Sequence, residues 1–301
     1  MAFKIKFMVN CSIGVCAYNE DKNIISHLRS LSAQQLKTVA ITEIIVVASG
    51  CTDKTVELVK EYQAEEPRVK LIIQDKREGK SAAVNLFIKS ALNQILILIS
   101  ADTLPKPETV EKLVSPFHDL KIGMAGGRPV PINSDKTFVG FCVNYMWCLH
   151  HLIALQTPKC GEMIVFRKVF EAIPASSAVD EACIEEKIKQ NNLDIIYIPD
   201  AIITNKGPEN IIDFLKQRRR IYSGHMALIK NSNYEVSTLG GGKILKLIIH
   251  NLPSSFKHKL WIPGMIFLEV WGRMLGAWDF YIKKKEPHIW NMAGSTKDLS
   301  R

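Results

Sequence analysis

Four short runs of Ile, Val and Leu alternate with amphipathic stretches, and this alternation constrains the fold more than any other feature of the sequence. The runs are CSIGVCA, EIIVVAS, VKLIIQ and ILILIS, at residues 11–17, 43–49, 69–74 and 95–100. Helical spacing of apolar residues occurs over residues 21–39 and 53–63. Strands buried on both faces have this continuous apolar character, and strand–helix alternation is typical of a parallel sheet with helices on both sides. The sequence therefore predicts an α/β, Rossmann-like fold with a mostly parallel sheet.

Small, polar and acidic residues follow all four predicted strands. In an open parallel sheet, ligands bind beyond the carboxyl ends of the strands, so these residues are expected to meet at one site. The segments are Ala17-Tyr18-Asn19-Glu20, Ser49-Gly50-Cys51-Thr52-Asp53, Arg77-Glu78-Gly79-Lys80 with Asn85 beyond it, and Ser100-Ala101-Asp102. Each segment alone is compatible with a turn or a helix cap. Their shared position indicates a nucleotide site.

The same segments, taken in order, resemble glycosyltransferase family 2, whose members are inverting enzymes with a GT-A fold. C-A-Y-N-E at 16–20 is similar to the family's P-A-Y-N-E, and A-S-G-C-T-D-K-T at 48–55 to its D-D-G-S-T-D-G-T. G-K-S-A-A-V-N at 79–85 is similar to G-K-a-x-A-x-N, and S-A-D-T-L-P at 100–105 to D-x-D-x-x-x-P. V-D-E-A-C-I at 179–184 resembles the E-D-x-x-L element, and K-Q-R-R-R-I at 216–221 resembles R-Q-R-x-R-W. The resemblance covers about residues 11–225.

Three positions depart from the family's pattern. Ala48-Ser49 stands where family members have paired aspartates, one of which contacts the nucleotide base, so the base stays open. Ser100 replaces the first aspartate of D-x-D and leaves Asp102 as the carboxylate of that motif. Ile221 replaces a tryptophan that is associated with polymer-extending members, which argues against processive synthesis.

The resemblance implies metal-assisted single displacement, in which a sugar moves from a UDP- or GDP-sugar to an acceptor hydroxyl or phosphate. Such chemistry uses a carboxylate base, and positive charge to neutralise the departing diphosphate. By register with Ile184, Glu181 is the expected base with Asp180 as the alternative, and Asp102 is the expected ligand of Mg²⁺ or Mn²⁺. The expected nucleotide-sugar-binding residues are Ala17, Tyr18, Asn19, Glu20, Ser49, Asp53, Gly79, Lys80, Asn85, Ala101, Asp102, Gln217, Arg218, Arg219 and Arg220.

The acceptor side is less defined by sequence. The loop before the apolar run IVFRK lies where family members form the floor of the acceptor site, so Gly161 and Glu162 are expected to bind the acceptor. His150, His151 and His225 are expected to be packing or acceptor-pocket residues, because adjacent histidines on a helix point in different directions and do not share a metal ion.

The charge is concentrated in the last part of the chain. Residues 216–301 carry 15 Lys and Arg against 5 Asp and Glu, whereas residues 1–215 carry 24 against 25. Four of the five tryptophans also lie there, at 261, 271, 278 and 290. We expect residues 1–236 to form the catalytic domain and residues 237–301 a basic amphipathic segment that attaches to an anionic membrane surface. Trp290 with Ser295-Thr296-Lys297 resembles the ending of membrane-associated family members, which implies a lipid-linked or glycan acceptor.

Other arrangements of this tail are a segment packed against the catalytic domain and a nucleic-acid-binding arm, and we expect no nucleic-acid partner. Residues 260–282 contain Pro263, Glu269, Arg273 and Asp279, a costly set inside a bilayer. Residues 138–155 have no formal charge but lie between segments of one expected site, so they predict a buried or interfacial helix. Seven cysteines without a C-x-x-C pair predict free thiols, and the first ten residues lack a signal-peptide core. The expected location is cytoplasmic, peripheral on the inner face of the cell membrane.

Two other functions are compatible with the sequence. A nucleotidyltransferase that forms sugar nucleotides uses a related sheet, but such enzymes carry a glycine-rich, basic signature where this chain has C-A-Y-N-E. A non-catalytic anion- or nucleotide-binding protein derived from a transferase is favoured by Ser49 and Ser100, which replace acids. Asp102 and the pair Asp180-Glu181 argue against that second alternative.

Overall fold

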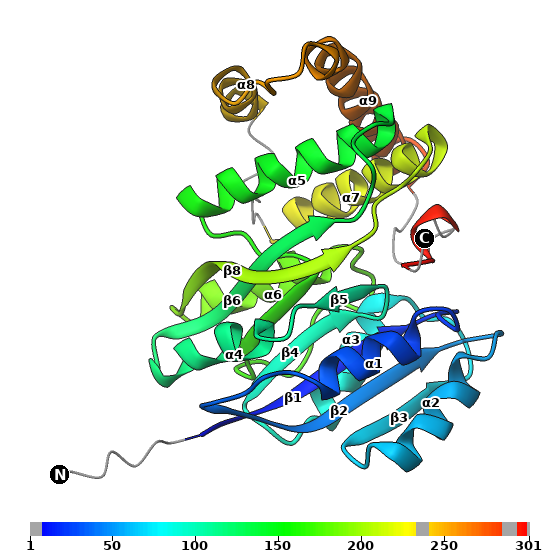
Figure 1. Cartoon of the computed structure of the whole chain (residues 1–301), viewed down its shortest axis with the longest axis vertical. Helices are drawn as coiled ribbons and strands as arrows, with labels where there is room; N and C mark the ends of the chain where they lie inside the picture. The colour runs from blue at the N-terminus through cyan, green and yellow to red at the C-terminus, as the bar shows by residue number, and fades with distance from the viewer. Residues whose placement is uncertain (1–7, 233–240, 285–293, 300–301) are drawn as a thin grey trace.

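The computed structural model describes residues 8–232, 241–284 and 294–299 (Figure 1). The strands are β1 (Val9–Ala17), β2 (Val39–Ser49), β3 (Val69–Gln74), β4 (Ile95–Ser100), β5 (Thr103–Pro105), β6 (Ile122–Pro131), β7 (Met163–Arg167) and β8 (Asp194–Asn205). Within the described residues they form one eight-stranded sheet in the order β3-β2-β1-β4-β7-β6-β8-β5. The four apolar runs of the sequence are β1 to β4, as predicted.

The sheet is parallel in its first half and mixed in its second. β1 pairs in parallel with β2 and β4, and β2 pairs in parallel with β3. β7 runs antiparallel to both β4 and β6, whereas β6 and β8 are parallel. The α/β fold is confirmed, and the parallel half brings the ends of β1, β2 and β4 to the same edge.

The helices cover both faces of this sheet. They are α1 (Ile24–Ser32), α2 (Thr55–Glu65), α3 (Lys80–Ser90), α4 (Thr109–Val114), α5 (Phe138–Gln156), α6 (Asp180–Gln190), α7 (Ile211–Ser232), α8 (Gly241–His250) and α9 (Phe256–Tyr281), with 3₁₀ turns η1 (Ser115–His118) and η3 (Gly294–Thr296). The helix expected over residues 21–39 is shorter than predicted: α1 ends at Ser32, because Val39 already pairs with Val9 in the sheet.

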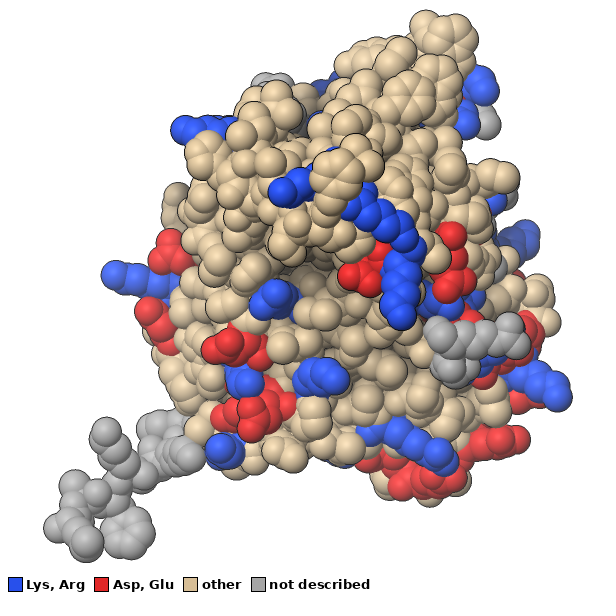
Figure 2. Space-filling model, turned by 45° about the horizontal axis from the view of Figure 1, so that its top comes forward, with Lys and Arg blue, Asp and Glu red and all other residues tan. Residues whose placement is uncertain are grey.

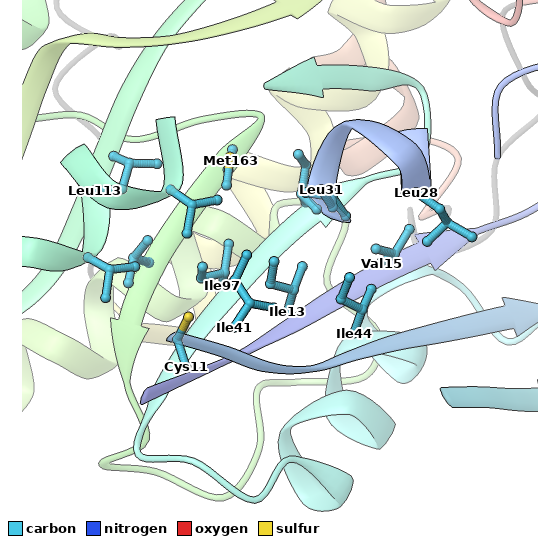
Figure 3. Packing of buried hydrophobic residues seen from close by; sticks show 14 of the residues in the cluster. Cys11, Ile13, Val15, Leu28, Leu31, Ile41, Ile44, Ile97, Leu113 and Met163 are labelled. Atoms are coloured by element: carbon cyan, nitrogen blue, oxygen red, sulfur yellow. The ribbon is translucent and has the colours of Figure 1, made fainter. Parts of the chain in front are cut away.

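Two buried clusters fill the space between sheet and helices. α1, α2 and α4 pack on one face, around Ile13 and Val15 of β1 (Figure 3), and α3 and α6 pack on the other. On that second face a Cβ at Gly14 would lie 2.4 Å from the ring of Phe87, so the ring of α3 rests directly on the backbone of β1. All seven cysteines are unpaired, as predicted.

A third apolar cluster joins α5, α7, α8 and α9 at one end of the sheet (Figure 1). α9 lies close against α7, where a Cβ at Gly276 would be 2.7 Å from the carbonyl oxygen of Arg219. Among the described helices, α5 alone has the length and apolarity of a membrane span, and 44% of that window is buried inside the protein. The described part of the predicted tail thus packs by one face against α5 and α7. The predicted boundary at residue 236, like Trp290, lies outside the described residues.

Candidate active site

Hydrogen bonds tie the loops after β1 and β2 to each other. The amide of Thr52 donates to Asn19 Oδ1 at 2.8 Å, and the amide of Asp21 donates to Asp53 Oδ2 at 3.1 Å. Burial acts to raise the pKa of Asp53, but donors from Thr55 and Asp21 more than offset it and hold that pKa below its usual value. Asn19 and Asp53 therefore fix the rim of the site.

A cavity of about 1000 Å³ opens beyond these strand ends. Most of the predicted residues line it, namely Ala17, Tyr18, Glu20, Ser49, Gly79, Lys80, Asp102, Gly161, Glu162, Asp180, Glu181, Gln217, Arg218, Arg219 and Arg220. Four predicted residues do not line it: Asn19, Asp53, Asn85 and Ala101. Asn85 instead exchanges two hydrogen bonds with the backbone of Ile173, at 2.8 and 2.9 Å, and so holds α3 to the loop before α6.

Lys80 lies between the two carboxylates predicted to be catalytic. It is the first residue of α3 and follows Gly79, whose φ of 95° turns the chain into the helix. Its Nζ is 3.0 Å from Asp180 Oδ2 and 3.0 Å from Glu181 Oε1. Burial and the neighbouring Glu181 raise the pKa of Asp180 to about 6. Burial opposes ionisation of Glu181 too, but Lys80 lowers its pKa to about 2.

Two further carboxylates face the same cavity. Burial raises the pKa of Asp102, against the opposing effect of Lys80 and Arg220. Burial, with Asp102 as the next cause, raises the pKa of Glu162 to about 7, and Asn205 Nδ2 donates to Glu162 Oε1 at 3.1 Å. Within the described ranges no group of three or more His, Cys, Asp or Glu forms a complete metal site. One or two carboxylates suit Mg²⁺ or Mn²⁺ when substrate phosphates and water supply the other ligands, so Asp102 with Glu162 fits such an ion.

The three consecutive arginines of α7 point in three directions, as a rotation of about 100° per residue requires. Arg220 lines the cavity and acts, with Lys80, to lower the pKa of Asp102. Arg219 forms an ion pair with Asp279 of α9. Arg218 faces α9, with its Nη1 3.8 Å from Glu269 Oε2. All three arginines line the cavity, and Arg219 also links α7 to α9.

Several lining residues were missed by sequence reasoning. They are Lys159, Lys206, Glu269 and Arg273. Arg77 belongs to a strand-end segment that was expected at the site, although it was given no binding role, and it too lines the cavity. Its guanidinium lies 4.1 Å from the centre of the Tyr18 ring. The sequence around Arg273 on α9 did not indicate a site, because that helix was expected to attach to a membrane.

The segment 294–299 returns to the site from the far end of the chain. Lys297 forms an ion pair with Glu20, and its carbonyl accepts a hydrogen bond from Asn23 Nδ2 at 2.9 Å. Ser295 Oγ donates to Asp213 Oδ2 at 2.7 Å. Thr296 and Lys297 line the cavity. This part of the predicted membrane segment therefore belongs to the wall of the site.

The fold and the cavity define an α/β protein with acids and cations around one cavity beyond the strand ends. Residues 12–166, just over half of the chain, match the family model described as glycosyl transferase family 2. The chain belongs to glycosyltransferase family 2, as the resemblance predicted.

Comparisons with individual proteins agree with this membership. A dolichol-phosphate mannosyltransferase of Mycosarcoma maydis is 32% identical over 149 residues, 48% of this chain and 48% of that protein. A poly-beta-1,6-N-acetyl-D-glucosamine synthase of Staphylococcus aureus (strain COL) is 25% identical over 242 residues, 75% of this chain and 56% of that protein. The chain thus spans about half the length of these curated relatives.

A solved structure shows the fold over nearly the whole chain. The mannosyltransferase PcManGT from Pyrobaculum calidifontis, in complex with GDP-Man and Mn²⁺, has a TM-score of 0.66 at 18% identity. The alignment covers 93% of this chain and 89% of that one. The GT-A fold with a C-terminal helical segment is therefore confirmed.

Proposed function

We propose that the chain is an inverting hexosyltransferase that moves a sugar from a UDP- or GDP-sugar to an acceptor carried by a lipid. The observation that carries this proposal is the convergence of Asp102, Lys80, Glu181 and Arg220 on one cavity in a family-2 chain. The relatives named for mannosyl transfer and for N-acetylglucosamine polymer synthesis support the reaction class.

The donor would lie along the ends of β1, β2 and β4. Ser49 Oγ is buried and has no hydrogen-bond partner among the described residues, so it is available to a nucleotide base. Arg220 and Lys80 are placed to bind the diphosphate, because guanidinium and ammonium groups pair with phosphate oxygens. Asp102 and Glu162 would hold Mg²⁺ or Mn²⁺, an ion that neutralises charge on the departing diphosphate. The Mn²⁺ in the Pyrobaculum structure supports this assignment.

Glu181 is the accessible member of the acid pair. Its side chain is 26% exposed, whereas that of Asp180 is 4% exposed. The acceptor oxygen bonds to the anomeric carbon as the bond from that carbon to the diphosphate oxygen breaks, and the diphosphate leaves with the electron pair. Glu181 takes the proton of a hydroxyl acceptor. A base works best when its pKa is near the working pH. A bound diphosphate would compete for Lys80 and thereby raise the pKa of Glu181.

Turnover with defined donors tests the proposal. The full chain is incubated with UDP-glucose, UDP-N-acetylglucosamine or GDP-mannose, Mn²⁺ and a lipid extract, and nucleotide release and product configuration are measured. We expect one donor to react with inversion. With an acceptor that attacks through a hydroxyl, we expect Glu181→Gln to lower kcat by about 100-fold or more with nucleotide affinity unchanged. Retention of configuration, or full turnover of a hydroxyl acceptor by Glu181→Gln, refutes the mechanism.

The same assay separates the alternatives. Metal-dependent nucleotide binding without turnover of any donor favours the non-catalytic binding protein. Pyrophosphate release from a nucleoside triphosphate and a sugar phosphate favours the nucleotidyltransferase.

An apolar arm of the cavity supports a lipid acceptor. This arm is the part of the cavity wall that α5, α8 and α9 line with hydrocarbon side chains. They include Val143, Met146, Ile244, Ile248, Met265 and Val270. A hydrocarbon chain fits an apolar pocket that adjoins a few polar groups.

The outer face of α8 and α9 supports attachment to an anionic membrane. Exposed apolar side chains on it include Leu245, Ile249, Phe256, Leu260, Phe267, Trp271 and Trp278. Exposed lysines accompany them, at Lys243, Lys246, Lys257, Lys259, Lys283 and Lys284. In Figure 2 the surface at the top of the view is mostly uncharged, with basic side chains along its margins. This pairing suits the cytoplasmic leaflet, where acyl chains take aromatic residues and anionic headgroups attract lysine.

Flotation with liposomes tests the attachment. We expect the chain to float with anionic vesicles at low salt, and Trp271→Ser to reduce the floated fraction. Leu120→Ser is the matched control, because Leu120 is an apolar residue that is 78% exposed and lies between η1 and β6, outside α8 and α9. A wild-type chain that stays at the bottom, or an equal loss in both variants, refutes attachment through this face.

A further inference from the structure

A second group of cations lines the same cavity as Lys80 and Arg220. Lys159 precedes β7, Arg218 lies on α7 and Arg273 on α9, and all three line the cavity. A Cβ at Gly272 would be 2.6 Å from Cβ of Arg218, so the two helices touch here. Arg218 and Arg273 therefore reach the same region from adjacent backbones.

The carboxylates near these cations are shared with other groups. Glu269 Oε1 accepts from Arg273 Nε at 2.8 Å, while Glu269 Oε2 is 3.8 Å from Arg218 Nη1, beyond hydrogen-bond distance. Arg218 Nε is buried and has no hydrogen-bond partner in the part of the chain that the structure describes. Glu185, the carboxylate that most opposes the lowered pKa of Lys159, is also 3.3 Å from Lys189 on its own helix. One carboxylate thus serves two guanidinium groups, and buried charge without a full partner is costly unless a ligand completes it.

The lowered pKa values of titratable groups around the cluster indicate an excess of positive charge there. Burial, and then Lys159, Arg218 and Arg273, lower the pKa of His225 to about 3. Burial lowers the pKa of Lys159 to about 8, with Glu185 opposing and the two arginines adding to the shift. His225 therefore stays neutral at physiological pH.

The cluster adjoins both the catalytic acids and the apolar arm. Glu181 acts on the pKa of Lys159 and of His225, so its carboxylate is close to them. Gly161 leaves the floor open, because a Cβ there would meet Trp147 and His150 of α5 only at 3.9 Å. A ligand held by the cluster would therefore contact the acid pair at one end and hydrocarbon at the other.

We infer that Lys159, Arg218 and Arg273 bind the phosphate group of the acceptor, and that the acceptor is a lipid phosphate whose chain occupies the apolar arm. Guanidinium groups bind phosphate oxygens in pairs, and an ammonium adds a third donor. This inference rests on the proposed function, since it names the acceptor class of the same site. It also separates two anion sites: Lys80 and Arg220 serve the donor, and the cluster serves the acceptor.

Binding of farnesyl phosphate, farnesol and inorganic phosphate to the full chain tests the inference. Arg273→Gln and Lys159→Gln each remove one charge from the cluster. Lys230→Gln is the matched control, because Lys230 is an exposed residue of α7 outside the cavity. We expect each cluster variant to weaken farnesyl phosphate about 10- to 100-fold, the effect of losing a hydrogen bond to a charged group. Farnesol, UDP and GDP should bind within about two-fold of wild type, and Lys230→Gln should bind all of them normally.

The other outcomes overturn the inference. Equal affinity of the wild type for farnesol and farnesyl phosphate removes the phosphate site. Loss of UDP or GDP binding in the cluster variants assigns these cations to the donor instead. Inorganic phosphate that binds as tightly as farnesyl phosphate shows a site for free phosphate, and the lipid is then excluded. Arg273→Lys retains the charge. If it folds and binds farnesyl phosphate better than Arg273→Gln does, the weaker binding of Arg273→Gln comes from the lost charge and not from misfolding.

Failure of the proposed function can be distinguished from failure of this inference. A chain that transfers no sugar still reports farnesyl phosphate binding in the same titration. A chain that binds no farnesyl phosphate still reports donor turnover on other acceptors.

Discussion

Replacing Lys80 with methionine keeps most of the side-chain volume and removes the ammonium that lies 3.0 Å from both Asp180 and Glu181. The Asp180 side chain is 4% exposed, but that of Lys80 is 37% exposed, so water screens part of the interaction. Exposed ion pairs contribute up to about 1 kcal/mol, and breaking a buried pair costs about 3–5 kcal/mol. We expect Lys80→Met to lose an intermediate amount, about 2 kcal/mol of unfolding free energy, at about pH 8.

The loss should shrink at low pH. The pKa of Asp180 is already raised to about 6 by burial and Glu181, above the value of about 3.9 in an unfolded chain. Without Lys80 it rises further. Between the unfolded and folded pKa values the folded state binds more protons than the unfolded state, so stability falls as pH rises through that window. At about pH 5 the Asp180 carboxyl of the variant takes up a proton, which replaces the positive charge of the missing ammonium. The loss of unfolding free energy relative to the wild type then becomes small.

Urea unfolding followed by circular dichroism at both pH values measures this difference. Lys112→Met is the matched control, because the Lys112–Glu108 pair at 2.9 Å is largely exposed and should contribute less than about 1 kcal/mol at either pH. A Lys80→Met deficit that is equal at both pH values, or no larger than that of Lys112→Met, would show that the ammonium does not stabilise the acid pair.

Three further outcomes follow from particular contacts. Asp102→Asn should weaken Mn²⁺-dependent nucleotide binding by more than about 10-fold in calorimetry while metal-free binding changes little, and an unchanged metal dependence would exclude Asp102 as a ligand. Gly14→Ala should lower the free energy of unfolding by about 1–3 kcal/mol, because the added Cβ would lie 2.4 Å from the Phe87 ring of α3. Gly242→Ala should be neutral or slightly stabilising in thermal unfolding, because its Cβ would meet no atom within 4 Å. Equal effects of the two variants would contradict this packing. Ser295→Ala removes the bond to Asp213 at 2.7 Å and should speed proteolysis near residue 295 several-fold at about pH 7.5, with an unchanged rate arguing against anchoring of that segment.

The parts of the fold that sequence predicted are those with a local physical cause. β1, β2 and β4 are buried over most of their length and carry their signal within six to eleven residues, so they could be recognised without knowledge of their neighbours. β3 was recognised from the same kind of apolar run, although it lies at the sheet edge and only Val69 and Gln74 in it are buried. The clustering of four loops followed from parallel pairing alone, because parallel strands end at the same edge. β7 runs antiparallel between β4 and β6, an arrangement that depends on contacts between distant segments.

The sequence predicted most of the residues around the site, but not the separate role of each one. Arg218, Arg219 and Arg220 were treated as one cluster, although helical rotation alone separates them. Asp53 and Asn85 share the polar character of ligand-binding residues, and the structure uses them to hold backbone segments. The phosphate cluster could not be found in advance, because Lys159 lies more than one hundred residues before Arg273 and neither belongs to a motif.

The pairing of Lys297 with Glu20 has a consequence for how the protein is made. The two residues are 277 positions apart, so the wall of the cavity joins two segments that are synthesised far apart in time. Contacts of such sequence separation form slowly and late. On the ribosome, the sheet can assemble while this wall is still missing, and a chain cut before residue 294 would keep its fold but leave Glu20 without its lysine. The donor pocket is therefore completed after synthesis of the helices that border the acceptor arm.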